Sequence, residues 1–321
     1  MHPLNLSLVA HADWSLRSAR RYLAIADLQP GGRWLVGAPA RPDALAADAT
    51  LCRALSMRTP GFCLLGLDLP LGVPRAWAEL AGVTDFCAFL EQDAGSASWA
   101  DFWHPATSPS EISLARPFYP MRPGGTSRAQ LVTGLGLSSP GDLRRRCDMP
   151  RPGATTPCPI FWTLGANQVG KAAITAWRDM LQPALSDPNL DVRLFPFEGS
   201  LYEATRGDLG LAEVYPAEVY AWLGLDLSGG GKRAQGARAA NASLILDAFS
   251  SLDADLTPDA LAQIIDGFGD CADGEDRFDS VVGLIGTMQV ALGVQPDGVP
   301  WGDHDVVAVE GWVLGRPHEV E

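Results

Sequence analysis

The stretch DGFGDCADGEDRFDSVVGLIGTMQVALG, Asp266 to Gly293, joins a group of acids to a long apolar segment. Its first fourteen residues carry six carboxylates, and the residues after them carry almost no charge. Apolar side chains in the second part recur at helical spacing, which predicts a buried helix over about 276–292. The sequence therefore places a cluster of acids at the start of a buried helix.

Two simple roles for these acids can be compared with the spacing. A calcium loop of the EF-hand type needs a glycine at its sixth position and a glutamate at its twelfth. Counted from Asp270, glycine comes fifth and no acid stands at the twelfth position, so the calcium loop is excluded. A solvated helix start explains Asp270, Asp273 and Glu275, because acids there accept free N–H groups and suit the helix dipole.

Asp279 is not explained by a solvated helix start. It heads a helical row with Gly283, Gly286 and Val290, and glycines on one helix face are typical of close approach to another backbone. Asp276 shares that side of the helix. An active-site role and a capped helix start both stay open at this point.

The composition describes a globular chain. It has 321 residues, 47% of them hydrophobic and 19% charged, which is enough to bury a full core. No apolar run is long enough to span a membrane and no signal-type segment is visible, so we expect a soluble, cytoplasmic protein with no membrane partner. Six cysteines without a C-x-x-C pair indicate neither a zinc site nor a disulfide framework.

The charge is unevenly distributed. The net charge is −14, which argues against general nucleic-acid affinity. The segment 116–178 nevertheless carries nine basic and two acidic side chains, a net charge of +7 that leaves −21 for the rest. This segment is a candidate contact for nucleic acid or another phosphate ester. The basic loop GGGKRAQGAR at 229–238 is a second.

The first part of the chain predicts a mixed α/β sheet. Residues 4–12 alternate as a strand that ends at Asp13, and RYLAIADL and RWLVGAP form a hairpin across a Gln-Pro-Gly-Gly turn. A helix near 43–56 is followed by the buried strand of GFCLLGLDLPLGVP, which ends at Asp68. The first and last of these strands can lie side by side.

The remainder predicts a single domain with an insertion. The region of about 84–190 is rich in Arg and Pro and is expected to be partly helical. Further predicted elements are strands at DVRLFPF and LAEVYP, a helix from Pro216 to Leu223, helices at about 233–251, 258–267 and 276–292, and a closing strand at DVVAVEGWVLG.

Five carboxylates stand at strand ends or helix starts, where chain reversal can bring them together. Clustered carboxylates repel one another unless a cation neutralises them, and divalent metal is the usual solution. The candidate metal ligands are Asp13, Asp68, Glu213, Asp276 and Asp279. Such a set is typical of two-metal phosphodiester hydrolysis with Mg²⁺ or Mn²⁺.

The arrangement resembles the RNase H-like superfamily. ADWS on a first strand, an acid ending the buried strand and DRFDS opening a late helix are similar to resolvases of the RuvC type. GLDLPLGVP, AEVYPAEVYAWLGL and DGEDRFDSVVGLIGTMQVALG more closely resemble the bacterial family of domain-of-unknown-function number 429, described as predicted RNase H-like nucleases. The resemblance implies Asp13, Asp68, Glu213 and Asp279 as catalytic ligands, with Asp276 beside them.

A second motif suggests phosphate binding. GANQVGK, Gly165 to Lys171, fits a phosphate loop but lacks the Ser or Thr that should follow the lysine. A helix opening after a glycine turn is the alternative. Lys171 and Arg144, Arg145 and Arg146 are candidate phosphate contacts, although three successive arginines also fit a solvated helix face.

The sequence therefore predicts an α/β, RNase H-like fold and a metal-dependent nuclease. A phosphotransferase or ATPase of related sheet topology is one alternative, although the duplicated glycine-rich hairpins of such folds are not visible. A noncatalytic binding protein on the same fold is the other.

Overall fold

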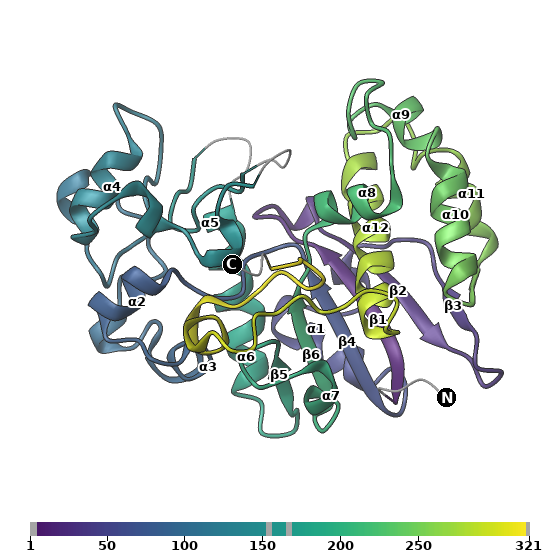
Figure 1. The fold of residues 1–321 in the computed structure, drawn as a ribbon, viewed down its shortest axis with the longest axis horizontal. Helices are drawn as coiled ribbons and strands as arrows, with labels where there is room; N and C mark the ends of the chain where they lie inside the picture. The colour runs from purple at the N-terminus through teal and green to yellow at the C-terminus, as the bar shows by residue number, and fades with distance from the viewer. Residues whose placement is uncertain (1–4, 152–155, 165–168, 319–321) are drawn as a thin grey trace.

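The fold is built on a central sheet with helices on both faces (Figure 1). The computed structural model describes residues 5–151, 156–164 and 169–318. The strands are β1 (Leu6–Asp13), β2 (Tyr22–Leu28), β3 (Trp34–Val36), β4 (Phe62–Leu67), β5 (Val192–Leu194), β6 (Leu209–Glu213) and β7 (Ala254–Leu256). They form one seven-stranded sheet in the order β5-β6-β4-β1-β2-β3-β7. The predicted α/β class with a mixed, helix-flanked sheet is confirmed.

The first strands pair as predicted. β2 is antiparallel to both β1 and β3, whereas β4 is parallel to β1. Ala12 at the end of β1 lies opposite Leu67 at the end of β4. Both strands therefore deliver their next residue to the same edge of the sheet.

The helices also follow the sequence closely in several places. α8 begins at Pro216 and ends at Leu223, because proline fits the first helical turn and Gly224 takes the left-handed conformation at its end. The helices are α1 (Asp48–Ser56), α2 (Arg75–Ala81), α3 (Phe86–Ala88), α4 (Arg128–Leu135), α5 (Val169–Ala176), α6 (Gln182–Leu185), α7 (Leu201–Ala204), α8 (Pro216–Leu223), α9 (Gln235–Ala239), α10 (Ala242–Ser251), α11 (Pro258–Ile265) and α12 (Gly274–Ala291). No helix among the described residues is long and apolar enough to cross a membrane.

The two faces of the sheet carry separate cores. Successive side chains of a strand point to opposite faces. In β1, Leu8, Ala10 and Ala12 belong to the core that includes α1, whereas Val9 belongs to the core that includes α12. α12 lies across β1 and β2 (Figure 1). The position of a residue in its strand thus decides whether it faces α12.

The glycines of α12 permit close packing, as their spacing predicts. A Cβ atom on Gly283 would lie 2.2–2.3 Å from imidazole atoms of His11, and one on Gly286 would lie 2.4 Å from Val219. His11 is completely buried, and this burial lowers its pKa to about 3. A neutral imidazole therefore fills the space that Gly283 leaves between helix and sheet.

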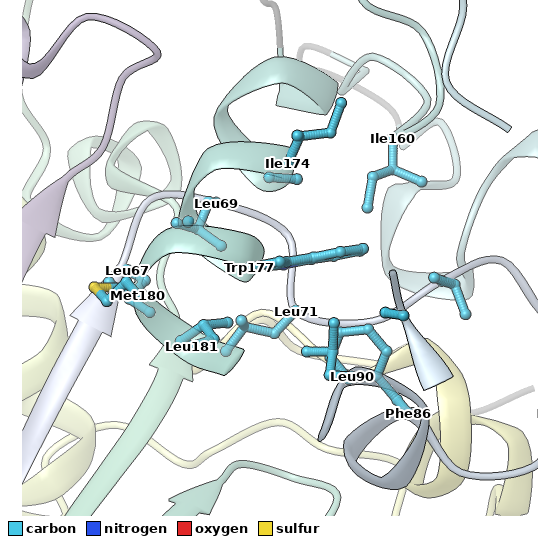
Figure 2. Packing of buried hydrophobic residues seen from close by; sticks show 14 of the residues in the cluster. Leu67, Leu69, Leu71, Phe86, Leu90, Ile160, Ile174, Trp177, Met180 and Leu181 are labelled. Carbon is cyan, nitrogen blue, oxygen red and sulfur yellow. The ribbon is translucent and has the colours of Figure 1, made fainter. Parts of the chain in front are cut away.

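A cluster on the other face holds the loop after β4. Trp177, between α5 and α6, packs among side chains that include Leu69, Leu71 and Phe86 (Figure 2). Its indole Nε1 donates a hydrogen bond to the carbonyl oxygen of Pro70 at 2.9 Å. The residues that follow Asp68 are therefore anchored, which fixes the direction in which its carboxylate leaves the sheet.

The prediction of a closing strand at DVVAVEGWVLG is wrong. Val306–Glu310 forms a helical turn, and only Val313 makes an isolated parallel bridge, to Glu213. The Glu310 carboxylate accepts hydrogen bonds from the backbone N–H groups of Arg75 and Arg146, both at 3.0 Å. These long-range contacts stabilise the turn against the strand propensity of its valines.

Two further differences concern the chain around α10. The predicted helix over 233–251 is divided at Asn241, whose side-chain amide pairs with the backbone of Asp226 at 2.7 and 2.9 Å. The short strand β7, Ala254–Leu256, was not predicted and pairs in parallel with β3 at the edge of the sheet. The predicted insertion at about 84–190 forms short helices beside the sheet (Figure 1).

Candidate active site

Four of the five predicted carboxylates line one cleft. Its volume is about 780 Å³, and Asp13, Asp68, Asp276 and Asp279 all contribute to its wall. The chain contains only two lysines, and both also line this cleft: Lys171 and Lys232. Oppositely charged groups from distant parts of the sequence therefore meet here.

Strand geometry explains why Asp13 and Asp68 meet. Asp13 is the last residue of β1 and Asp68 follows the last residue of β4, at the shared edge. By alternation, Asp13 lies on the same face as His11, and Asp68 on the same face as Gly66, where a Cβ would approach Thr287 of α12. Both carboxylates are therefore directed to the face that α12 covers.

α12 supplies the other two acids from its first two turns. The Asp279 side chain is only 4% exposed. It accepts a hydrogen bond from the Tyr220 hydroxyl on Oδ1 and forms an ion pair with the Lys232 ammonium through Oδ2. Asp276 lies nearer to solvent and pairs with Arg20 Nε at 2.6 Å. The Asp279 position, which a helix cap does not explain, is thus the most buried corner of the site.

Burial and mutual repulsion raise the pKa values of the acids in the cleft. Burial, followed by the charges of Asp279, Asp68 and Asp276, raises the pKa of Asp13 well above its usual value. Burial and the charge of Asp279 raise the pKa of Asp68 to about 7, and burial raises that of Asp276 to about 6. A bound cation would relieve this repulsion.

This electrostatic arrangement predicts a pH dependence of stability. The folded protein holds the proton of Asp68 more tightly than the unfolded chain, with a pKa raised from 3.8 to about 7. The protonated carboxyl group of Asp68 therefore makes its full contribution to the free energy of unfolding below about pH 4, and this contribution is lost as the pH rises through 7. Asp68→Asn should be more stable than the parent at pH 8 by at least about 1 kcal/mol, since one pKa unit corresponds to about 1.4 kcal/mol.

Urea unfolding in the presence of a chelator, from pH 4.5 to 8, measures this difference. The difference should be much smaller at pH 4.5 than at pH 8, because Asp68 is protonated in the folded protein at pH 4.5. Asp247→Asn on the exposed side of α10 is the control and should follow the parent at every pH. A difference that does not change with pH would contradict the assigned repulsion.

Glu213 does not line the cleft of the other acids, although it lines a smaller cavity together with Asp68, and its pairing with Arg145 corrects its predicted role as a metal ligand. It lies opposite Leu67 in the sheet and so shares the face of Leu67, away from α12. Both of its carboxylate oxygens pair with Arg145, at 2.6 and 2.8 Å, and one also accepts the backbone N–H of Leu71 at 2.8 Å. Glu213 is therefore engaged in a buried structural ion pair.

The three successive arginines do not line the cleft of the acids, and they do not form the solvated helix face that was the alternative. Arg145 is 1% exposed and binds Glu213 and Asp148. Arg144 donates to the carbonyl oxygens of Asp148 and Pro157 at 3.1 and 2.5 Å, and Arg146 pairs with Asp303. All three therefore have partners within the protein, Arg145 in its interior and Arg146 at its surface.

Lys171, the fourth predicted phosphate contact, lies in the cleft of the acids. It lies in the first turn of α5, lines the cleft, and has no ion pair within the described ranges. Gly165 to Gln168 of the phosphate-loop motif lie outside the described residues. Lys171 is therefore the one member of the predicted phosphate-binding set that lines the cleft of the acids.

Three residues of the site were missed by sequence reasoning. Lys232 and Tyr220 bind Asp279, and Arg20 binds both Asp276 and Glu275. The glycine-rich loop of Lys232 was recognised as basic, but nothing local in it indicates a partner 47 residues away. The scarcity of lysine was the available signal, since both lysines of an arginine-rich chain lie in the cleft.

The donor atoms suit a hard divalent cation, but their arrangement is not that of a closed metal site. Within the part of the chain that the structure describes, no three His, Cys, Asp or Glu side chains are grouped to hold one ion. The Lys232 ammonium engages Asp279 instead.

Comparisons with protein-family models, with curated proteins and with solved structures find no match to this chain.

Proposed function

We propose that this protein is an Mg²⁺- or Mn²⁺-dependent phosphodiester hydrolase with an RNase H-like fold. The observation that carries the proposal is the convergence of Asp13, Asp68 and Asp279 in one cleft. They come from two adjacent parallel strands and from a helix that is distant in sequence. Buried like charges destabilise a fold, so their presence together favours a functional explanation.

The strand arrangement supports the RNase H-like assignment. An antiparallel run of β1, β2 and β3 is followed by β4 in parallel beside β1. The acids stand at the end of the first strand, just after the fourth and at the start of a late helix, which is the order that the sequence resemblance implies. The family of domain-of-unknown-function number 429 is accordingly the proposed relationship.

The chemistry of the donors fits this class of cofactor. Carboxylate oxygens are the ligands that Mg²⁺ and Mn²⁺ prefer, and Asp13, Asp68 and Asp279 would hold the ions, with Asp276 at the rim. When bound, the ions would activate water and stabilise the leaving oxygen. Asp13 and Asp68 provide negative charge from a rigid sheet edge, and Tyr220 orients the Asp279 carboxylate through its hydroxyl.

The arginine-rich segment favours a small substrate. Five of its nine basic side chains form ion pairs within the protein: Arg116, Arg145, Arg146, Arg151 and Arg178. A continuous track for a duplex backbone needs free cations, because affinity for long nucleic acid depends on counterion release. We therefore propose short single strands or small phosphodiesters as substrates, bound between the acids and Lys171.

A substrate panel tests the function. The purified protein would be assayed with Mg²⁺ or Mn²⁺ on dinucleotides, a nitrophenyl nucleotide ester, and single-stranded, duplex, hybrid and branched oligonucleotides. We expect hydrolysis of the short and single-stranded substrates, with rates that depend little on salt. Absence of hydrolysis on every substrate would remove the proposal.

Lys171→Met tests the phosphate contact. The variant should raise KM about tenfold with kcat changed less than about twofold, because a charge-assisted contact to phosphate of about 1.4 kcal/mol would be lost from ground state and transition state alike. Steady-state kinetics on the best small substrate measure this. Arg122→Met, at an exposed arginine outside the cleft, is the control and should leave KM unchanged. A loss confined to kcat would contradict the assigned role.

A further inference from the structure

Lys232 occupies a special place among the acids. Its ammonium is paired with Asp279 Oδ2, and its side chain is 43% exposed while that of Asp279 is 4% exposed. Lys232 also lines the same cleft as Asp13 and Asp68. The same three carboxylates that the proposed function assigns to metal therefore share one cleft with this lysine.

The backbone of Lys232 is firmly held. Arg238 is 1% exposed and donates from Nη1 to the Lys232 carbonyl oxygen at 2.6 Å. Its Nε and Nη2 donate to the carbonyl oxygens of Gly267 and Gly269 at 2.8 and 2.7 Å. Arg238 thereby fastens the loop to the segment that leads into α12. The ammonium, at the end of a flexible four-carbon stem, can move while its backbone stays in place.

Both oxygens of Asp279 are engaged, one by Tyr220 and one by Lys232. A divalent ion that takes Asp279 as a ligand must compete with the ammonium for the same carboxylate. The competition requires no change in the sheet, since only the lysine side chain has to withdraw.

We propose that Lys232 is the tethered counterion of the carboxylate cluster and is replaced there by the divalent ion, which releases its ammonium towards the substrate phosphate. This inference rests on the proposed function, because it concerns ion binding at the same acids. Lys232 is then a positioning residue: it holds the cluster together before metal binds and lowers the apparent affinity for metal.

Titration calorimetry with Mn²⁺ alone tests the competition in the full-length protein. Lys232→Met should bind Mn²⁺ about tenfold or more tightly than the parent, because the ion no longer has to displace a charge. It should also unfold several degrees lower than the parent in chelator and recover on addition of Mn²⁺. Lys232→Arg keeps the charge and should bind Mn²⁺ as weakly as the parent.

The matched control is Arg233→Met, the next residue of the same loop. Its side chain is 81% exposed, with its Nε 3.7 Å from Glu275, so both Mn²⁺ affinity and stability should stay at parent values. Unchanged or weaker Mn²⁺ binding by Lys232→Met, with normal binding by the parent, would overturn the inference and leave the proposed function in place. Absence of Mn²⁺ binding by the parent would overturn both.

A measurement on the parent protein covers the case in which Lys232→Met fails to fold. Acylation of Lys232 by an amine-reactive ester, followed by mass spectrometry, should be slow in chelator and at least severalfold faster with Mn²⁺, since the ion frees the amine from Asp279. Lys171, which has no such partner among the described residues, is the internal reference. Equal rates with and without Mn²⁺, in a protein that binds Mn²⁺, would contradict displacement.

Discussion

Asp13→Asn should reduce kcat/KM for hydrolysis by on the order of 10³-fold. The negative charges of Asp279, Asp68 and Asp276 all raise the pKa of Asp13, so Asp13 lies at the electrostatic centre of the cluster. An amide keeps the shape of the side chain but removes the negative charge that would hold a divalent ion. Metal ions supply several kcal/mol of transition-state stabilisation, and each 1.4 kcal/mol corresponds to a factor of ten.

The same substitution should stabilise the metal-free fold at pH 8. The raised pKa of Asp13 means that its ionised form is disfavoured in the folded protein, so removing the charge relieves repulsion. Activity and thermal stability should therefore change in opposite directions, which separates a lost catalytic charge from a damaged fold. Asp247→Asn controls for loss of an exposed carboxylate and should change neither quantity.

Parallel assays of hydrolysis and thermal unfolding in chelator measure both effects. Full activity of Asp13→Asn with Mg²⁺ and with Mn²⁺ would exclude the proposed site. A variant that loses activity and stability together would instead show that Asp13 has a structural role.

Strand order and side-chain alternation made much of the site accessible from the sequence. β1 ends in an aspartate and β4 is followed by one, and parallel neighbours deliver their ends to the same edge, so Asp13 and Asp68 were predicted to meet. The glycine row behind Asp279 predicted that α12 approaches closely, and Gly283 against His11 confirms it. These features depend on local periodicity, which a sequence shows directly.

The same alternation, applied further, would have excluded Glu213. Leu209 and Leu211 of β6 lie in the core on the α1 face, and Glu213 has the same parity. Its carboxylate therefore leaves the sheet on the face opposite to α12. The prediction considered the strand end and not the strand face, and a shift of one residue reverses that face.

Long-range charge pairs were beyond local reasoning. Arg144, Arg145 and Arg146 are chemically identical in the sequence, yet only Arg145 is fully buried, because the chain turns there against the end of β6. Lys232 likewise finds its carboxylate 47 residues away. The partner of a long side chain depends on the packing of separate elements, which composition and spacing do not specify.

Arg145→Met should lower the free energy of unfolding by about 3–5 kcal/mol, the usual cost of removing one partner of a buried ion pair. The guanidinium is 1% exposed and pairs with Glu213 and Asp148, which are 6% and 4% exposed. Methionine fills part of the volume but leaves two buried carboxylates without a cation. Urea unfolding at pH 7 in chelator measures the loss.

The neighbouring Arg146→Met is the matched control, because its ion pair with Asp303 is exposed and should contribute at most about 1 kcal/mol. Glu213→Gln separates the structural role of this glutamate from the ligand role that the sequence first suggested. Because Glu213 is a partner of Arg145, Glu213→Gln should lower the free energy of unfolding. The Mn²⁺ affinity should remain within about twofold of the parent value, since the Glu213 carboxylate faces away from Asp279. A Glu213→Gln protein of unchanged stability that has lost Mn²⁺ binding would return Glu213 to the metal site and would require the Arg145 pair to open during ion binding.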